Sequence, residues 1–170
     1  GLAELIHRVA VEKDTFRVTD DYAVCEGADV ILIDVQTPTD EHHVPRYESL
    51  REVAGHVGRH LQPGTLVIIE STVAPGTTQH VVQPILERES GLTAGAVNLQ
   101  PSTFNLEHRF LLAFSYERVM PGRLLAYLTD FPRVVGGIDP ESTRRAVDLY
   151  RHIVRAQITP TDVLPADRAK

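Results

Sequence analysis

Residues 66–78 of this chain read LVIIESTVAPGTT, and this stretch decides the fold. It opens with the four apolar residues Leu66–Ile69, continues through the polar segment Glu70–Thr72, and reaches a Pro75-Gly76 pair before two threonines. An apolar run without polar alternation is typical of a strand buried on both faces of a parallel sheet. The turn residues then lead into apolar side chains at helical spacing, so the stretch predicts one strand–turn–helix unit.

The same kind of unit recurs along the rest of the chain. Further apolar runs rich in β-branched or large side chains predict strands at Val30–Ile33, Phe110–Phe114 and Val134-Val135. Amphipathic spacing predicts helices over Leu2–Glu12, Tyr47–Leu61, Thr78–Glu89 and the segment that follows Asp139-Pro140. Alternating strands and helices predict an α/β fold, with right-handed crossovers and a parallel sheet that carries helices on its faces.

Composition limits the class of protein and its partners. The chain has 170 residues, enough for one domain, with 42% hydrophobic and 24% charged residues. Its net charge of −6 comes from interspersed acidic and basic residues, which argues against a nucleic-acid partner. No apolar run approaches the roughly 20 residues that span a bilayer, so we expect no membrane partner. The single cysteine, Cys25, excludes an internal disulfide and is compatible with the cytoplasm; we expect it to be a small, partly buried hydrophobic side chain.

Polar residues follow three of the predicted strands, at Thr37-Pro38, Ser71-Thr72 and Tyr116-Glu117. Open α/β sheets bind ligands beyond the carboxyl ends of their strands, so these residues are candidates for a binding site. Thr37-Pro38 is equally compatible with a turn that only ends a strand.

The other two strand ends also allow two interpretations each. Backbone N–H groups at Gly76-Thr77 could hold an anion, while Thr77 could simply cap the helix that follows. Glu117 beside Arg118 is suited to act as a general base near an anionic substrate, or the two form a surface ion pair of little energetic weight.

Four ordered motifs make the pattern specific. They are Ala28-Asp29-Val30…Thr37-Pro38, Glu70-Ser71-Thr72-Val73…Pro75-Gly76-Thr77, Tyr116-Glu117-Arg118-Val119…Pro121-Gly122 and Arg133-Val134-Val135-Gly136-Gly137. In this order they resemble the nucleotide-sugar 6-dehydrogenases, the UDP-glucose/GDP-mannose dehydrogenase family, and most closely its UDP-N-acetylmannosamine dehydrogenase branch. The resemblance runs from about Leu2 to Lys170.

The resemblance implies a cofactor, a substrate and a role for each matching residue. Thr37 and Pro38 would lie along the adenosine and ribose of NAD, and Ser71 and Thr72 near its nicotinamide, with Thr72 also holding the catalytic water. The remaining implied roles are a general base at Glu117, nucleotide-sugar contacts at Arg118, Val119 and Gly122, and a catalytic lysine that stabilises an oxyanion at Lys170.

The family reaction oxidises the C6 alcohol of a nucleotide sugar to a carboxylate with two NAD⁺, through a thiohemiacetal on a cysteine. Two of its parts do not match here: no Gly-x-Gly-x-x-Gly turn is present, and Cys25 does not align with the catalytic thiol. We therefore expect an incomplete Rossmann-like open sheet, mainly parallel, that lacks its first βα unit. The expected organisation is a partial NAD-binding domain at residues 1–162 and, at 163–170, the start of a helix leading to a central domain. Turnover by the chain alone is not expected, while the full-length enzyme would be a homodimer or larger.

Other interpretations remain open on the sequence alone. A non-catalytic nucleotide-binding or assembly module would keep this fold without the chemistry, and half of a hydroxyacid dehydrogenase would share the sheet.

Tyr116 replaces the proline usual before the family's general base. The segment 93–109 is longer than the family connection, which suggests disorder or an insertion. Asp40–His43 holds metal-ligand residue types, but adjacent histidines on a loop seldom converge on one ion.

Overall fold

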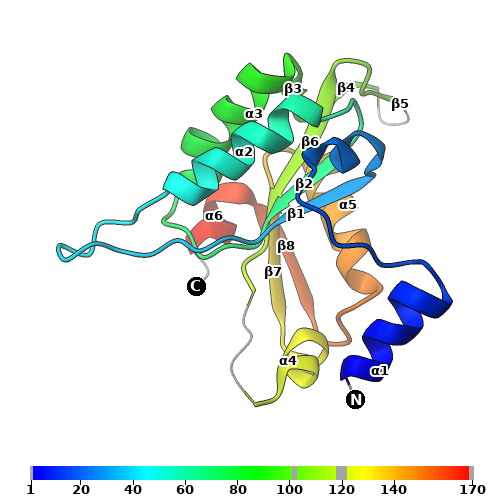
Figure 1. The fold of residues 1–170 in the computed structure, drawn as a ribbon. Helices are drawn as coiled ribbons and strands as arrows, with labels where there is room; N and C mark the ends of the chain where they lie inside the picture. Colours follow the sequence, from blue (N-terminus) through cyan, green and yellow to red (C-terminus); the bar gives the residue numbers. More distant parts are fainter. Residues whose placement is uncertain (1, 101–102, 118–121, 169–170) are drawn as a thin grey trace.

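The computed structural model describes residues 2–100, 103–117 and 122–168. They contain a mixed six-stranded sheet covered by helices and a separate two-stranded sheet (Figure 1). The strands are β1 (Val30–Ile33), β2 (Leu66–Ile69), β3 (Thr93–Ala94), β4 (Val97–Gln100), β5 (Thr103–Asn105), β6 (Arg109–Phe114), β7 (Arg133–Gly137) and β8 (Ile158–Asp162). The α-helices are α1 (Leu2–Ile6), α2 (Glu48–His60), α3 (Gln83–Ser90), α4 (Leu124–Asp130), α5 (Pro140–Arg151) and α6 (Val163–Arg168). Two π-helices, η1 (His7–Glu12) and η3 (Thr78–Val82), and a 3₁₀-helix, η2 (Tyr22–Gly27), complete the described elements.

The sheet has the order β1-β2-β6-β7-β8, and β3 pairs with β6 outside this path. Strands β1, β2 and β6 are parallel, which confirms the α/β prediction for this part of the chain. The expectation of a mainly parallel sheet is confirmed: β7 and β8 are also parallel to each other, and the exception is β7, which pairs antiparallel to β6. Helix α4 lies beyond the end of the sheet rather than across its face (Figure 1), so the chain re-enters the sheet from the edge at which β6 ends.

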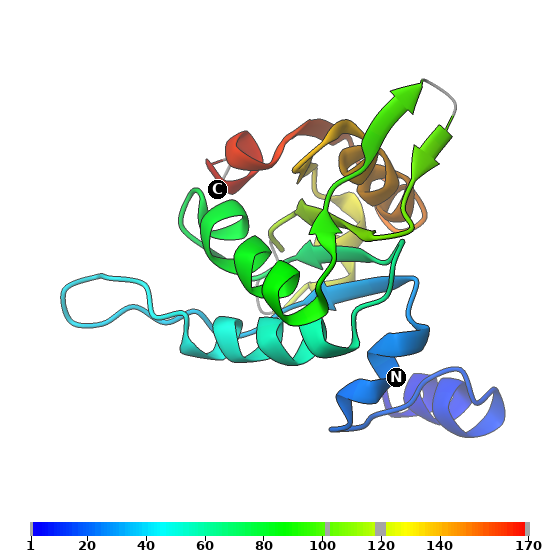
Figure 2. The ribbon, with the colours of Figure 1, turned by 90° about the horizontal axis from the view of Figure 1, so that it is seen from above.

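Helices cover both faces of the sheet, as predicted. Helices α2 and α3 lie side by side on one face (Figure 2), where Ala54 and Leu86 pack with α6 against Val67 and Ile69. On the other face, Tyr150 of α5 and its neighbours pack against the alternate residues of β2 and β6. This alternation follows from the two-residue period of a strand.

The glycine pair Gly136-Gly137 at the end of β7 is explained by this packing. A Cβ atom at Gly136 would lie 2.3 Å from the carbonyl oxygen of Asp162, and one at Gly137 would lie 2.3 Å from the backbone nitrogen of Thr143. Only glycine permits such a close approach of α5 and α6 to the sheet.

Several local predictions are corrected by the structure. The predicted helix over 78–89 is divided into η3 and α3, and the predicted first helix is divided into α1 and η1. The segment 93–109, for which the sequence suggests disorder or an insertion, contains β3 and an antiparallel β4–β5 pair in its described residues. Strand β1 is not buried on both faces, because Leu32 is 48% exposed on the edge of the sheet. Cys25 is half-buried against the core, as expected.

Candidate functional site

The carboxyl ends of β1, β2 and β6 meet at one edge of the sheet and surround a cavity of about 350 Å³. Its lining consists of Asp34, Val35, Gln36, Thr37, Glu70, Ser71, Thr72 and Glu117. Three strand ends that are far apart in the sequence are thus brought together, because parallel neighbours end at the same edge. Their four candidate residues Thr37, Ser71, Thr72 and Glu117 line the same cavity.

Hydrogen bonds link the loop after β1 to the loop after β2. The Thr37 hydroxyl donates to the carbonyl oxygen of Thr72 over 2.5 Å, and the Val35 N–H donates to the Ser71 hydroxyl over 2.7 Å. Ser71 is buried, so its hydroxyl holds the two loops together. The side chain of Thr72, in contrast, is exposed beside the cavity.

The other predicted site residues lie elsewhere or outside the described residues. Pro38 is exposed beyond the cavity, and its carbonyl oxygen accepts a hydrogen bond from the Arg46 N–H over 2.7 Å. Gly122 is exposed, with a φ of 104° that favours glycine. Arg118, Val119 and Lys170 are outside the described residues, so their roles stay predictions.

A buried arginine, Arg133, contacts the cavity lining through Glu70. Because β7 runs antiparallel to β6, Arg133 at its start lies at the same edge as the ends of β2 and β6. Its guanidinium group forms an ion pair with Glu70 and donates from Nε to the Ser115 hydroxyl over 2.7 Å. Tyr150 of α5 donates its hydroxyl to the same Glu70 carboxylate over 2.5 Å. Burial raises the pKa of Tyr150, so this hydroxyl keeps its proton and remains a donor.

The turn at Gly76-Thr77 does not present a free anion site. The carboxylate of Asp167 in α6 accepts the Gly76 N–H over 2.8 Å and the Thr78 hydroxyl over 3.1 Å. Burial raises the pKa of Asp167, although these hydrogen bonds oppose the shift. Thr77 occupies the N-cap position of η3, as expected, but its side chain makes no capping hydrogen bond, because its hydroxyl donates to the Tyr47 hydroxyl instead.

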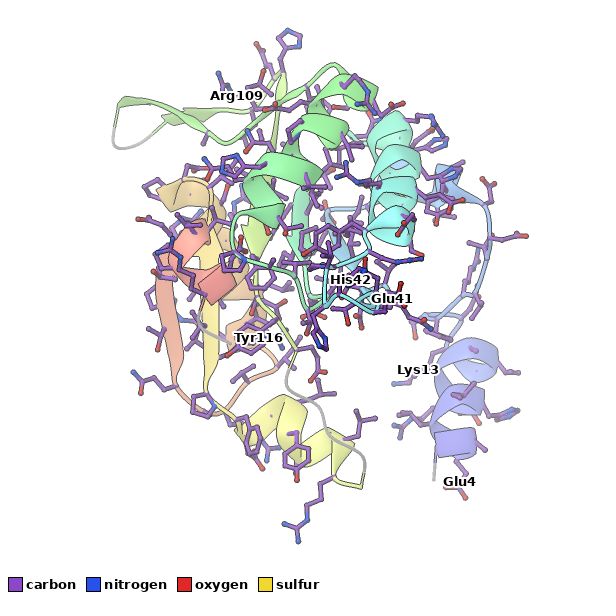
Figure 3. The ribbon with its side chains drawn as sticks, turned by 90° about the vertical axis from the view of Figure 1, so that its left-hand side faces the viewer. Glu4, Lys13, Glu41, His42, Arg109 and Tyr116 are labelled. Carbon is purple, nitrogen blue, oxygen red and sulfur yellow. The ribbon has the colours of Figure 1, made fainter. Side chains whose placement is uncertain are left out.

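The Asp40–His43 segment forms a turn that extends away from the body, with Glu41 and His42 labelled in Figure 3. The Asp40 carboxylate accepts the N–H groups of His42 and Val44, each over 2.9 Å, so it stabilises the turn. Among the described residues, no group of three or more His, Cys, Asp or Glu side chains is arranged to hold a metal ion. Tyr116, also labelled in Figure 3, is buried and stacks on Phe114 with the ring centroids 6.1 Å apart.

The fold defines a Rossmann-like domain with a cavity at the carboxyl ends of three parallel strands. Residues 1–154 match the family model of the NAD binding domain of the UDP-glucose/GDP-mannose dehydrogenase family. This chain belongs to that family.

Relatives and solved structures agree with the family assignment. A UDP-N-acetyl-D-mannosamine dehydrogenase of Pyrococcus horikoshii is 34% identical over 154 residues, which cover 91% of this chain and 34% of the relative. A UDP-N-acetyl-D-glucosamine 6-dehydrogenase of Pseudomonas aeruginosa is 33% identical over 142 residues, covering 84% of this chain and 30% of the relative. The crystal structure of an NDP-N-acetyl-D-galactosaminuronic acid dehydrogenase from Methanosarcina mazei superposes with a TM-score of 0.86 at 39% identity, covering 100% of this chain and 34% of that chain. The chain therefore spans about a third of the length of these relatives.

The cavity fits one end of NAD⁺ better than the other. Its acidic lining residues are Asp34, Glu70 and Glu117, of which Glu70 is neutralised by its ion pair with Arg133. None of the described lining residues is basic, which suits the positively charged nicotinamide ring. A pyrophosphate needs unoccupied N–H groups at a helix start, but the one suggested by the sequence is filled by Asp167. The described residues thus fit the nicotinamide end of the cofactor and provide no phosphate cradle at the turn after β2.

Sequence reasoning did not identify the roles of Arg133, Tyr150 and Asp167. For Arg133, the one signal in the sequence was its position: it is a charged residue directly before the apolar strand residues Val134-Val135. A charged side chain that becomes buried with a neighbouring strand needs an oppositely charged or hydrogen-bonding partner. This rule would have prompted a search for the partner of Arg133.

In the described part of the chain, no helix is both long and apolar enough to cross a membrane.

Proposed function

We propose that this chain is the NAD-binding part of a nucleotide-sugar 6-dehydrogenase. The reaction would oxidise the C6 alcohol of a UDP-hexose or UDP-N-acetylhexosamine to the uronate, with two NAD⁺ accepting four electrons. The observation that carries the proposal is the convergence of Thr37, Ser71, Thr72 and Glu117 on one cavity. The names of the relatives from Pyrococcus horikoshii and Pseudomonas aeruginosa favour a substrate with an N-acetylated hexosamine.

The candidate residues at the three strand ends each have a proposed task. Thr37-Pro38 and Ser71 would shape the surface on which the cofactor lies, and NAD⁺ supplies the hydride acceptor when it is bound. Thr72 would orient a water molecule for the hydrolytic step, and Glu117 would accept a proton from that water. Glu117 is half-buried at the wall of the cavity, where a general base can reach both water and substrate.

Further roles are proposed on the family resemblance. Arg118, Val119 and Gly122 would contact the nucleotide sugar, and Lys170 would stabilise the developing oxyanion. Residues 1–162 would form the cofactor-binding part, and residues 163–170 would begin the connection to a central domain. The full-length enzyme would act as a homodimer or larger assembly in the cytoplasm, supplying uronates for polysaccharide synthesis.

The first test asks whether the cavity binds the nicotinamide end of the cofactor. The ¹⁵N-labelled chain is titrated with nicotinamide mononucleotide and, separately, with ADP-ribose, and amide shifts are recorded by NMR. We expect nicotinamide mononucleotide to shift the amides of Ser71, Thr72 and Glu117, and ADP-ribose to shift that of Thr37. A Thr72→Val variant should weaken the response to nicotinamide mononucleotide. Thr159→Val, at an exposed position on β8, is the matched control. Shifts confined to other parts of the chain would contradict the proposed site.

The second test places the chain in a catalytic context. The aligned 154 residues of the Pyrococcus horikoshii relative are replaced by those of this chain, and NADH formation is followed with UDP-N-acetylmannosamine. We expect turnover by this chimera, and a loss of roughly 10²–10⁴-fold in kcat for Glu117→Gln, because a general base contributes about this much. Cofactor binding by a folded chimera without turnover would favour a non-catalytic nucleotide-binding module.

A further inference from the structure

Four side chains that the proposed mechanism does not use form a hydrogen-bonded cluster, which reaches the cavity through its lining residue Glu70. They are Glu70, which follows β2, Ser115, which follows β6, Arg133 at the start of β7, and Tyr150 in α5. In the ion pair, the Arg133 and Glu70 side chains are only 10% and 13% exposed. Water therefore cannot easily replace one partner if the other moves.

Arg133 contacts two strand ends at once. Its Nε donates to the Ser115 hydroxyl over 2.7 Å, and Nη2 donates to the Ser115 carbonyl oxygen over 3.1 Å while also bonding to the Glu70 carboxylate. The Cζ atom lies 3.9 Å from the centroid of the Tyr150 ring, which fixes the plane of the guanidinium group. A planar fork with several donors can satisfy these contacts together, whereas a lysine ammonium cannot.

The backbone of Glu70 is hydrogen-bonded to residues at the ends of the two neighbouring strands, β1 and β6. Its N–H donates to the carbonyl oxygen of Ile33 over 2.9 Å, and its carbonyl oxygen accepts the Glu117 N–H over 3.3 Å. Glu70 thus joins the end of β1 to the residue that we propose as general base, and its carboxylate is held by Arg133 and Tyr150.

We infer that Arg133 is a positioning residue for this site: by holding Glu70 and Ser115 together, it fixes the backbone that carries Glu117 and Thr72. The inference rests on the proposed function for the meaning of the site, but its test requires no cofactor or turnover. Failure of one is therefore distinguishable from failure of the other.

The test is amide hydrogen exchange of the chain, measured by NMR for Arg133→Met and for unchanged protein. The amides of Glu70, Ser115 and Glu117 report on the site, and the Leu111 amide, which donates to the Thr65 carbonyl oxygen over 2.9 Å, reports on the far end of the sheet. We expect exchange at the three site amides to accelerate by at least about tenfold more than exchange at Leu111, because local opening is governed by local contacts. An equal acceleration everywhere would overturn the inference and leave Arg133 as a general stabiliser.

Two further variants keep the test decisive if Arg133→Met does not fold. Arg133→Lys retains the charge and loses the fork, so we expect the same three amides to exchange faster relative to Leu111. If Arg133→Lys shows the same ratio of site-amide to Leu111 exchange as the unchanged protein, charge suffices and the inference is overturned.

Tyr150→Phe removes one donor to Glu70 and should produce the same pattern to a smaller extent. An unaltered exchange pattern in this variant would contradict the inference. Arg151→Met, an arginine lost from the exposed side of α5, is the matched control and should leave the ratio unchanged.

Discussion

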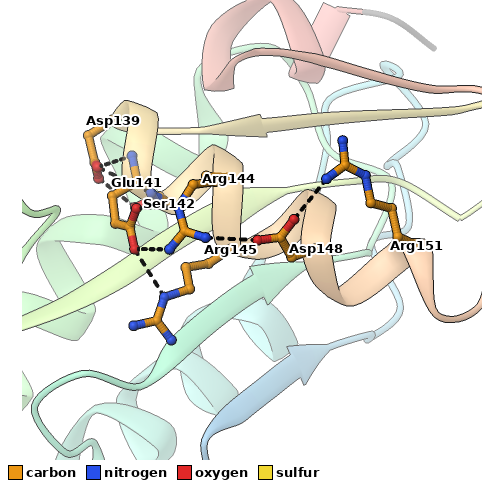
Figure 4. Close-up of polar contacts among 7 residues, drawn as sticks. All are labelled: Asp139, Glu141, Ser142, Arg144, Arg145, Asp148 and Arg151. Carbon is orange, nitrogen blue, oxygen red and sulfur yellow. Dashed lines mark hydrogen bonds and ion pairs between the residues drawn. The ribbon is translucent and has the colours of Figure 1, made fainter. Parts of the chain in front are cut away.

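Two arginine–carboxylate clusters in this molecule use the same chemistry in different surroundings. The buried cluster consists of Glu70, Arg133, Ser115 and Tyr150, and the surface cluster lies along α5 (Figure 4). In the surface cluster, Arg144 and Arg145 both pair with Glu141, while Arg144 and Arg151 both pair with Asp148.

The two clusters differ in the number of arginines that pair with each carboxylate and in the exposure of those arginines to water. Each carboxylate of the surface cluster has two arginine partners. Glu141 is itself only 2% exposed, but the arginines that pair with the two carboxylates are at least 50% exposed, and Arg151 is 68% exposed. In the buried cluster, a single arginine serves both strand ends. Loss of one arginine should therefore be tolerated on α5 and be severe in the buried cluster, since an unpaired buried charge is strongly destabilising.

The largest effect is expected for Arg133→Met. Removing the guanidinium group leaves Glu70 buried without its cationic partner, which should lower the free energy of unfolding by about 3–5 kcal/mol. Urea denaturation of the chain measures this change. A loss below about 1 kcal/mol would mean that the two clusters do not differ in the way we describe.

The two clusters should also respond at opposite ends of the pH scale. Burial raises the pKa of Tyr150 above the ordinary tyrosine value of 10.0, so the unfolded state loses this proton first and stability falls as the pH rises above about 10. The fall attributable to Tyr150 should approach about 1 kcal/mol per pH unit and be absent in Tyr150→Phe. Hydrogen bonding from Arg144 holds the pKa of Glu141 below the ordinary glutamate value of 4.5, so the contribution of the surface cluster is present above that pH and is lost as the pH falls below it. Denaturation curves between pH 3 and 11 would test both limbs, and an alkaline fall that persists in Tyr150→Phe would exclude Tyr150 as its source.

An intermediate effect is expected at Asp139, which begins the helix that carries the surface cluster. Its carboxylate accepts the Glu141 N–H over 2.8 Å and the Ser142 N–H over 3.2 Å, so it caps α5. Asp139→Ala should lower the free energy of unfolding by about 1 kcal/mol, while Asp139→Asn should retain most of the stability. Equal losses for alanine and asparagine would argue that charge, rather than capping, is responsible.

The smallest effect is expected for Arg151→Met. Asp148 keeps Arg144 as its partner, and the lost ion pair is exposed, so the free energy of unfolding should change by less than about 0.5 kcal/mol. Thermal and urea denaturation would detect a larger change, which would show that the surface cluster acts as a cooperative network.

The sequence predicted those parts of the fold that depend on local patterns. The apolar runs at Val30–Ile33, Leu66–Ile69 and Phe110–Phe114 all form strands, and the α2 and α5 segments form helices. Because the ends of parallel neighbours meet at one edge, the grouping of Thr37, Ser71, Thr72 and Glu117 followed from the same patterns. Their catalytic and binding roles stay predictions.

The direction of β7 was not predictable in this way. A short helix between two strands can belong to a crossover, which makes the strands parallel, or to a connection at one edge of the sheet, which makes them antiparallel. The connection through α4 is of the second kind. This reversal places Arg133 beside Glu70, although 63 positions separate them in the sequence.

Local apolar periodicity alone therefore determined that this chain forms a layered α/β domain whose three strand ends share one edge. Only the tertiary structure decided how polar groups pair across that edge. Asp167 fills a helix start 91 positions away, and Arg133 joins two strand ends, because buried charges must find partners wherever the packed chain brings them close. Such pairings leave no periodic trace in the sequence.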